Sequence, residues 1–279
     1  MDRPTVAALL TEGAAELPRR EGIPDPRREA VWLLARAWGR SEVTVRTDAA
    51  AVPPDVVVGR YREWLRRRAA GEPAHHLTGS CPFWGREFQV CPDVLVPRPE
   101  TELIVEAALA LEPGRVRRVL DVGTGSGCLA VTLVCERPGW RVTATDLSPR
   151  ALRVAAANAR RHGVRVGFVR CDLASALTGP FDLVVANLPY VPSASLPDLP
   201  LEVRHDPVSA LDGGPNGLDL VSRLVKDLPR LLAPAGQALL EVGAGQAERV
   251  RVVAGEVLAW EKPVNDLGGV HRVVRLHRQ

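Results

Sequence analysis

The chain has 279 residues, of which 46% are hydrophobic and 25% charged, and its net charge at pH 7 is +3. A chain of this length can bury a core in each of two domains. So small a net charge argues against stable nucleic-acid binding. No apolar run is long enough to span a membrane and no signal peptide is recognised, so we expect a cytoplasmic protein without membrane contact.

The cysteines and histidines do not indicate a metal site. Five cysteines and six histidines are present without a paired metal-ligand spacing, so we predict no metal. An odd number of cysteines without a disulfide pattern is typical of a reducing compartment. We expect Cys128 to be a small helix residue and not a nucleophile, and His75 and His76 to lie at the surface.

The pattern of apolar residues divides the chain into three parts. Residues 1–72 contain helical stretches with apolar spacings of three to four, separated by proline or glycine, which predict a small helical domain. Residues 73–96 hold short β-like pieces and prolines, which predict a β-hairpin linker. In residues 97–279 strands alternate with helices, which predicts an α/β domain with a doubly wound, Rossmann-like sheet. The last strands are predicted at 237–242 and 271–276, as its antiparallel end.

The run Arg60–Arg68 is rich in arginine and carries two aromatic residues. It could contact RNA, or it could be the solvated face of a helix. We favour the solvated face, with Trp64 and Leu65 turned inward, because long charged side chains commonly cover a helix in this way.

A glycine-rich turn stands between a predicted strand at 116–122 and a predicted helix at 128–136. The turn reads Gly123-Thr-Gly-Ser-Gly127. Glycine lets the backbone approach a ligand closely, and the first turn of the helix offers unpaired N–H donors. This order of elements therefore predicts a cofactor-binding turn.

Acidic residues end the next two predicted strands. The strand at 140–145 leads to Asp146, about 20 residues beyond the glycine turn, where an acid can accept both ribose hydroxyls of an adenosine. The strand at 165–171 leads to Asp172 and Leu173. This polar group and apolar side chain could receive an adenine ring.

A tetrapeptide that can hold a planar nitrogen follows the apolar run at 181–186. It consists of Asn187, Leu188, Pro189 and Tyr190. The side-chain carbonyl of Asn187 can accept one N–H of an amide or exocyclic amine, and the backbone carbonyl of Leu188 the other. Pro189 favours an extended Leu188, and Tyr190 offers a face for stacking. A strand followed by a plain proline turn is the alternative.

The four features follow one another along the chain, and we expect their strands to lie in the sheet in the same order. Together they predict a methyltransferase that uses S-adenosyl-L-methionine. One rival remains, because Gly125-Ser-Gly-Cys-Leu-Ala130 satisfies a relaxed dinucleotide fingerprint. A nicotinamide enzyme would leave the tetrapeptide unexplained, and the sequence offers no separate hydride-transfer constellation.

Longer stretches around these motifs resemble one known family. Asp121-Val-Gly-Thr-Gly-Ser-Gly127 resembles the cofactor loop, and Asn187-Leu-Pro-Tyr190 resembles the Asn-Pro-Pro-Tyr motif, of the release factor glutamine methyltransferases (PrmC/HemK). Val96-Pro-Arg-Pro-Glu-Thr-Glu102 is close to the most distinctive segment of that family. The stretches 83–88, 202–207 and 210–218 fit as well. Leu188 departs from the usual proline, and Leu173 stands where some relatives carry an aromatic residue.

The resemblance implies methylation of the glutamine side-chain amide in the Gly-Gly-Gln loop of class I peptide chain release factors. An amide nitrogen is a poor nucleophile, so two oxygen acceptors on its N–H groups would orient it and favour the charge that develops on it. We take the helical domain to recognise this protein partner. Three alternatives stay open: a ribosomal-protein glutamine, a nucleic-acid adenine that would have to be flipped or unpaired, and a noncatalytic binding module.

The predicted site contains no metal ligand and combines two sets of residues. The catalytic set is Asn187, Leu188, Pro189 and Tyr190. The cofactor-binding set is Gly123, Thr124, Gly125, Ser126, Gly127, Asp146, Asp172, Leu173 and again Asn187.

Overall fold

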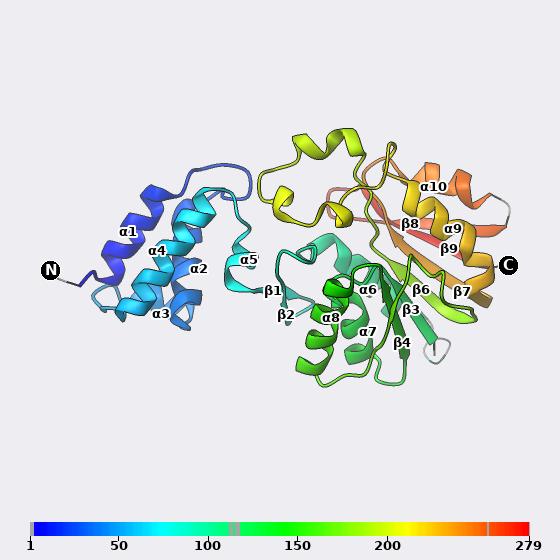
Figure 1. Ribbon diagram of the computed structural model, residues 1–279, viewed down its shortest axis with the longest axis horizontal. Coiled ribbons are helices and arrows are strands. Elements are labelled where there is room, and N and C mark those ends of the chain that lie inside the picture. The colour runs from blue at the N-terminus through cyan, green and yellow to red at the C-terminus, as the bar shows by residue number, and fades with distance from the viewer. Residues whose placement is uncertain (1–2, 112–113, 115–117, 256, 279) are drawn as a thin grey trace. The chain divides into compact units, whose positions relative to one another are not determined.

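The computed structural model describes residues 3–111, 114, 118–255 and 257–278 (Figure 1). The chain forms two compact units. The helical unit comprises Met1–Ser80 and Leu199–His205, and the sheet unit comprises Cys81–Asp198 and Asp206–Gln279. Because Leu199–His205 belongs to the helical unit, the chain passes between the units three times.

The helical unit is built from α1 (Val6–Glu16), α2 (Pro26–Trp38), α3 (Glu42–Thr47), α4 (Asp55–Ala69) and α5 (Ala74–Thr78). Thr5 and Asp25 begin α1 and α2, where each side chain accepts a backbone N–H from the first turn. The core centres on Tyr61, which is fully buried and donates its hydroxyl to the carbonyl of Leu9 at 3.2 Å. No described helix combines the length and the apolar character that a membrane span requires.

One of the two adjacent histidines of the helical unit is buried and the other is half-buried, so the expectation of two surface histidines is wrong for His76. His76 is buried, and the ring of His75 packs edge-on against Trp32 with 5.5 Å between the ring centres. The sequence gives little warning of this, because the apolar partner lies on α2, far from the histidines along the chain.

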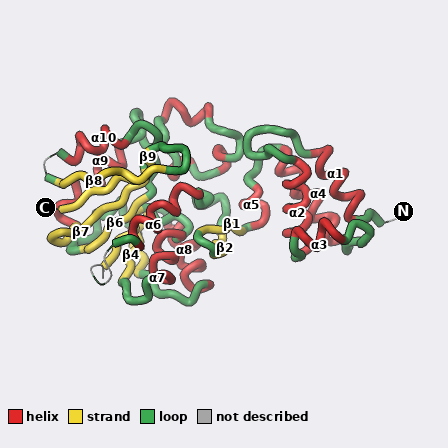
Figure 2. Tube along the Cα trace, turned by 180° about the vertical axis from the view of Figure 1, so that it is seen from behind, coloured by secondary structure: helices red, strands yellow, loops and turns green. Residues whose placement is uncertain are grey.

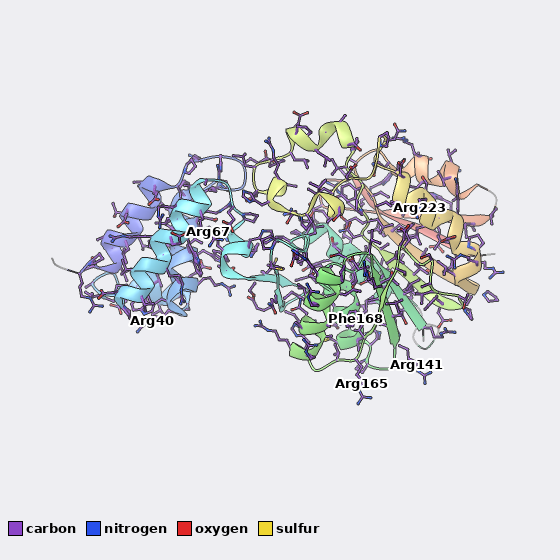
Figure 3. The ribbon with its side chains drawn as sticks, viewed as in Figure 1. Arg40, Arg67, Arg141, Arg165, Phe168 and Arg223 are labelled. Atoms are coloured by element: carbon purple, nitrogen blue, oxygen red, sulfur yellow. The ribbon has the colours of Figure 1, made fainter. Side chains whose placement is uncertain are left out.

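The arginine-rich run Arg60–Arg68 lies on α4 and is solvated over most of its length. Leu65 is buried and Trp64 half-buried, as the spacing predicts. Arg67, labelled in Figure 3, is exposed and pairs with Glu72 at 2.5 Å. Ion pairs of this kind at the surface contribute little to stability.

Arg68 is the exception in this run, because its side chain is only 3% exposed. Its guanidinium lies 2.6 Å from a carboxylate oxygen of Glu29 and 2.9 Å from one of Glu202, and it donates to the backbone carbonyl of Gly22 at 2.6 Å. Buried charge requires such partners, since an unpaired buried cation is strongly unfavourable. Glu202 belongs to Leu199–His205, so this ion pair anchors that segment, here called the strap, in the helical unit.

The sheet of the sheet unit has the described strand order β5-β4-β3-β6-β7-β9-β8. The strands are β3 (Arg118–Val122), β4 (Arg141–Asp146), β5 (Gly167–Arg170), β6 (Phe181–Ala186), β7 (Leu232–Glu241), β8 (Leu258–Asn265) and β9 (His271–Arg278). Strands β3 to β7 are parallel, and β9 runs antiparallel to both of its neighbours.

Helices cover both faces of this sheet (Figure 2). One core joins the sheet to α6 (Glu102–Leu109), α7 (Cys128–Glu136) and α8 (Pro149–Arg161), and the other joins it to α9 (Asp219–Leu231) and α10 (Ala247–Ala254). Successive residues of a strand point to opposite faces, so Val119 belongs to the first core and Leu120 to the second. The predicted doubly wound α/β architecture is confirmed.

The order of the strands differs from the order expected along the chain. We expected β6 to lie beyond β5, but β6 pairs with β3 on the side opposite β4. The direction of winding reverses between β3 and β6, which makes their carboxyl ends the switch point where ligands of open sheets bind. Gly123 after β3 and Asn187 after β6 are thereby brought together.

The far edge of the sheet was also predicted incompletely. Of the residues predicted at 237–242, all but Val242 fall within β7, which is parallel to β6, and only β9 and β8 form the antiparallel end. The missed strand β8 carries charges and Pro263, which is typical of an edge strand and hides its alternation. Residues 116 and 117 of another predicted strand lie outside the described residues.

The segment 73–96 contains a helix as well as the expected hairpin. After α5 the hairpin is formed by β1 (Ser80–Phe83) and β2 (Arg86–Gln89). The buried Asn158 of α8 links this hairpin to the glycine turn, because its amide nitrogen donates to the carbonyls of Gln89 and Ser126 at 3.0 and 2.8 Å. The remaining short turns are the 3-10 helices η1 (Pro99–Thr101), η2 (Ser193–Asp198), η3 (Val203–His205) and η4 (Val208–Ala210).

Candidate active site

A cavity of about 320 Å³ lies beyond the carboxyl ends of the parallel strands, within the sheet unit. Its volume is in the range of small-molecule sites. Sequence reasoning missed the contributions of segments 93–98 and 207–210. The predicted site residues that line the cavity are Gly123, Thr124, Gly125, Ser126, Asp146, Asp172, Leu173, Asn187, Leu188 and Pro189. Gly127 and Tyr190, which were also predicted, are not among the lining residues.

The backbone of the glycine turn needs glycine at three positions. Gly123, Gly125 and Gly127 have φ angles of +73°, +55° and +80°, a region that side chains disfavour. A Cβ atom at Gly123 would lie 2.8 Å from the Leu188 side chain, and one at Gly127 would lie 2.9 Å from Ala155. The turn is therefore fixed both by its own conformation and by its neighbours.

The carboxylate of Asp121, a residue of β3, fixes the glycine turn by hydrogen bonds. Sequence reasoning did not assign this role. One carboxylate oxygen accepts the Thr124 hydroxyl at 2.6 Å and the Ala130 N–H at 3.2 Å. The other oxygen is buried and has no hydrogen-bond partner among the described residues. Burial raises the pKa of Asp121 to about 7, although both hydrogen bonds oppose the shift. An acid at the end of an apolar strand, directly before a glycine turn, was the signal for this residue.

Asp146 ends β4 and faces the glycine turn. Its carboxylate accepts the Gly125 N–H at 2.9 Å and the Ser148 N–H at 2.8 Å, one on each oxygen. Burial raises the pKa of Asp146, and these backbone donors oppose the shift. Each oxygen keeps a further lone pair. The group can therefore accept two more donors from a ligand in the cavity.

The end of β5 supplies one polar and one apolar side chain to the cavity. Asp172 forms an ion pair with Arg223 of α9, whose position Figure 3 shows, at 2.6 Å. Leu173 is half-buried against the α9 core and has a φ of +49°, which is unusual for a side chain of its size. This conformation turns the chain away from the sheet directly beyond the strand.

The side chain of Asn187 is held by a chain of buried hydrogen bonds. Its amide nitrogen donates to the Thr101 hydroxyl at 2.9 Å, and that hydroxyl donates to a carboxylate oxygen of Glu241 at 2.7 Å. Thr101 is 2% and Glu241 1% exposed. Burial raises the pKa of Glu241 to about 7, although the Thr101 hydrogen bond opposes the shift. Among the described residues the carbonyl oxygen of Asn187 has no hydrogen-bond partner, and Asn187 lines the cavity.

The rest of the tetrapeptide is held by its backbone and by one buried side chain. Leu188 is 4% exposed and packs against Gly123, so its side chain joins the two strand ends. The Tyr190 carbonyl accepts from the Gln246 amide at 2.9 Å. The Tyr190 hydroxyl faces Glu241 at 3.5 Å, and burial raises its pKa to about 12.

The resembled segment that contains Val96 and Arg98 meets a second resembled segment at Asp206. Arg98 lies 2.6 Å from a carboxylate oxygen of Asp206, and the Val96 N–H donates to the other oxygen at 3.2 Å. The Asp206 carboxylate is completely buried. Since both segments line the cavity, this pair fixes its outer wall.

Two other kinds of chemistry find little support in the site. Burial raises the pKa of Cys128 to about 12, so the thiolate that a nucleophile needs is strongly disfavoured. Among the described residues, no three His, Cys, Asp or Glu side chains form a group that could hold a metal ion.

Comparison with known proteins shows what the chain is similar to. Residues 8–79 match the family described as PrmC N-terminal domain, and residues 100–197 match the Methyltransferase small domain family. The release factor glutamine methyltransferase of Moorella thermoacetica is 41% identical over 97% of this chain and 99% of its own length. That of Bradyrhizobium diazoefficiens is 38% identical, with 98% and 92% covered. The chain belongs to the release factor glutamine methyltransferase family.

Family membership confirms the resemblance inferred from the motifs and shows that the chain is an enzyme, a methyltransferase. It leaves no place for the nicotinamide alternative. The release factor glutamine methyltransferase of Deinococcus radiodurans is 41% identical to this chain, and the match covers 97% of each protein. The match thus includes the helical unit, where the motifs were fewest.

Solved structures agree on the fold. A methyltransferase from Pyrococcus furiosus matches 70% of this chain and 90% of its own, with a TM-score of 0.54 and 16% identity. The Thermus thermophilus 16S rRNA N2 G1207 methyltransferase, solved with AdoMet and guanosine, matches 72% of this chain and 50% of its own, with a TM-score of 0.53 and 20% identity. At such identities the likeness shows the fold alone.

Proposed function

We propose that this enzyme transfers a methyl group from S-adenosyl-L-methionine to the side-chain amide nitrogen of the glutamine in the Gly-Gly-Gln loop of class I peptide chain release factors. The observation that carries the proposal is the carbonyl oxygen of Asn187, a cavity-lining residue, because this oxygen has no hydrogen-bond partner among the described residues. The substrate named for its relatives, a release factor glutamine, presents an N–H of the kind that this oxygen accepts.

The residues around the cavity fit S-adenosyl-L-methionine. Asp146 retains lone pairs for two ribose hydroxyls, and Asp172 and Leu173 would border the adenine. The glycines at 123, 125 and 127 let the backbone come close to the ligand. When bound, the cofactor supplies an electrophilic methyl group next to the lip.

The protein's share of the chemistry is to orient the glutamine amide. In the proposed complex the Asn187 side-chain oxygen and the Leu188 backbone oxygen each accept one amide N–H. Both acceptors are fixed before the substrate binds, Asn187 by Thr101 and Leu188 by its burial against Gly123. Preorganised acceptors favour positive charge on the attacked nitrogen without further reorganisation. Stacking of Tyr190 on the amide plane remains part of the proposal.

We assign recognition of the intact protein substrate to the helical unit. The support is indirect: residues 8–79 match a domain named for this family, and the strap that follows the tetrapeptide in the chain belongs to this unit. A partner held there would place its loop at the lip at high effective concentration.

The decisive experiment offers the enzyme two substrates with labelled cofactor. One is a purified class I release factor, and the other is ribosomal RNA. Mass spectrometry should locate the label on the glutamine of the Gly-Gly-Gln peptide, and a release factor with that glutamine replaced by asparagine is the matched control. Label in RNA adenine and none in the release factor would refute the proposal. Label in the asparagine control would lie either on the asparagine amide or on another residue, and the fragment masses of the peptide distinguish the two.

A further inference from the structure

We infer that Thr101 and Glu241 are positioning residues, which hold Asn187 in the one orientation that presents a hydrogen-bond acceptor to the substrate. The inference rests on the proposed function and deepens it. The two ends of an asparagine side chain have nearly the same shape but opposite hydrogen-bonding character. If the Asn187 amide turned over, its N–H₂ group would face the substrate N–H₂ group, and the acceptor would be lost.

The direction of each hydrogen bond follows from the chemistry of the three groups. An ionised Glu241 has no proton and can only accept. The Thr101 hydroxyl has one proton, and it gives that proton to Glu241 at 2.7 Å. Toward Asn187, Thr101 therefore offers only a lone pair, and only the amide nitrogen can meet it, at 2.9 Å. The orientation of Asn187 is thus determined by a charge on a different strand.

Burial makes this control strict. Water can repair a wrong amide orientation at an exposed site, but Thr101 and Glu241 are at most 2% exposed. An unsatisfied polar group in such surroundings costs about 1–3 kcal/mol. A buried carboxylate at the end of an apolar strand, as Glu241 is in β7, is itself unfavourable. The positioning of Asn187 through Thr101 would explain why the charge of Glu241 is buried here.

The charge on Glu241 is balanced by groups from several elements. Arg272 of β9 and the Tyr190 hydroxyl favour the ionised carboxylate, and Glu100 of η1 opposes it. When Glu241 takes up a proton, it can donate to Thr101. The Thr101 hydroxyl can then donate onward, and the Asn187 oxygen becomes its partner. Because burial raises the pKa of Glu241 to about 7, this reversal falls near neutral pH.

Removal of the Thr101 hydroxyl tests the inference. Thr101→Val should lower kcat by about tenfold to a hundredfold, as expected for a misplaced reacting group, and leave the cofactor Kd unchanged. Thr101→Ser should retain most of the turnover, because it keeps the hydroxyl. The matched control is Thr132→Val, which removes a fully buried hydroxyl of α7 that does not line the cavity. This control should leave kcat unchanged.

The pH dependence distinguishes positioning from simple packing. In the wild type, kcat should fall as the pH decreases through about 7, the pKa of Glu241. Glu241→Gln cannot take up a proton, so this acid limb should disappear, and its kcat should be lower at high pH because an amide can also donate to Thr101.

A spectroscopic readout makes the test independent of the substrate. The ¹⁵N resonance of the Asn187 side-chain amide, assigned by its loss in Asn187→Ala, should titrate with Glu241 in the wild type and not in Thr101→Val. Normal kcat in Thr101→Val, or an Asn187 amide that does not respond to pH, would overturn the inference. If the wild type fails to methylate the release factor, the proposed function is wrong, and the amide spectrum still decides the positioning role.

Discussion

The two ends of the cavity are built in different ways. The end proposed for the cofactor, here called the cofactor end, is formed by the backbone of one continuous turn, Gly123–Gly127, with Asp146 beside it, and the end proposed for the substrate is called the substrate end. The substrate end consists of side chains from three segments, because Asn187 and Thr101 are 86 residues apart and Thr101 and Glu241 are 140 residues apart. The cofactor end thus depends on local conformation, whereas the substrate end depends on the whole fold of the sheet unit. Damage to one end should leave the other intact.

The largest effect is expected from Asn187→Ala, which breaks only the substrate end. Turnover should fall about a hundredfold or more, because the lost carbonyl acts mainly when charge develops on the attacked nitrogen. The cofactor Kd should stay close to that of the wild type. Single-turnover methylation of the release factor and calorimetric titration with S-adenosyl-L-methionine measure the two quantities. A normal methylation rate would contradict the assigned role of Asn187.

Asp146→Ala is the converse change and breaks the cofactor end. Loss of a charged acceptor should weaken cofactor binding by roughly 1.5–3 kcal/mol, which is about a tenfold to hundredfold increase in Kd. At saturating cofactor, kcat should recover most of its wild-type value, since the lip is untouched. The same calorimetric titration provides the test. An unchanged Kd would remove Asp146 from the cofactor site.

The buried carboxyl of Asp121, beside the cofactor end, should make the stability of the protein depend on pH. Its pKa is raised from 3.8 to about 7, so the folded state holds a proton that the unfolded state has released. Stability from this group is complete below pH 3.8 and is lost as the pH rises to about 7, at up to roughly 1.4 kcal/mol per pH unit.

Asp121→Asn should therefore flatten the dependence of the unfolding free energy on pH within that window. Urea unfolding without cofactor at several pH values between about 4 and 8 measures this slope. Glu241, whose pKa is also raised, contributes a slope of the same sign in both proteins. The matched control is Asp48→Asn, which makes the same replacement at an exposed carboxyl. A slope in Asp121→Asn equal to that of the wild type would show that Asp121 ionises normally.

The smallest effect is expected from Leu188→Pro, at the residue that joins the two ends. Proline keeps the backbone carbonyl and stiffens the chain, so methylation should stay near the wild-type rate. Loss of part of the buried side chain should reduce stability by about 1 kcal/mol, partly offset by the reduced freedom of the unfolded chain. Leu188→Ala, which has the same carbonyl without the stiffness, is the control. A large loss of turnover in the proline variant alone would mean that the leucine conformation is specific.

The same contrast explains what the sequence could predict. Gly123–Gly127, Asp146 and Asn187 were recognised because each stands directly after an apolar run, and local patterns indicate where such runs end. Thr101 lies within the recognised segment 96–102, but neither its role nor that of Glu241 could be read from the sequence, since both roles arise from contacts across the fold. A glutamate within the apolar run of β7 was the one indication, and its meaning depends on which strand lies beside it.

For the strands and for Arg68 too, local patterns were predicted from the sequence and contacts between distant segments were not. The parallel strands were found from short apolar runs, but their order was not, because pairing β6 with β3 depends on how the helices cross the sheet. The edge strand β8 lacks a clear alternation and was missed. Arg68 was placed among solvated arginines because its partner Glu202 lies 134 residues away.

The strap limits how this protein can be divided or recombined. A fragment that begins after Ser80 would still carry Leu199–His205, with Glu202 deprived of Arg68, and an isolated helical unit would keep Arg68 without that carboxylate. The two units are therefore not interchangeable modules. A chimera with the helical unit of a relative should work only if the strap is exchanged with it, so that these two separate stretches of sequence are inherited together.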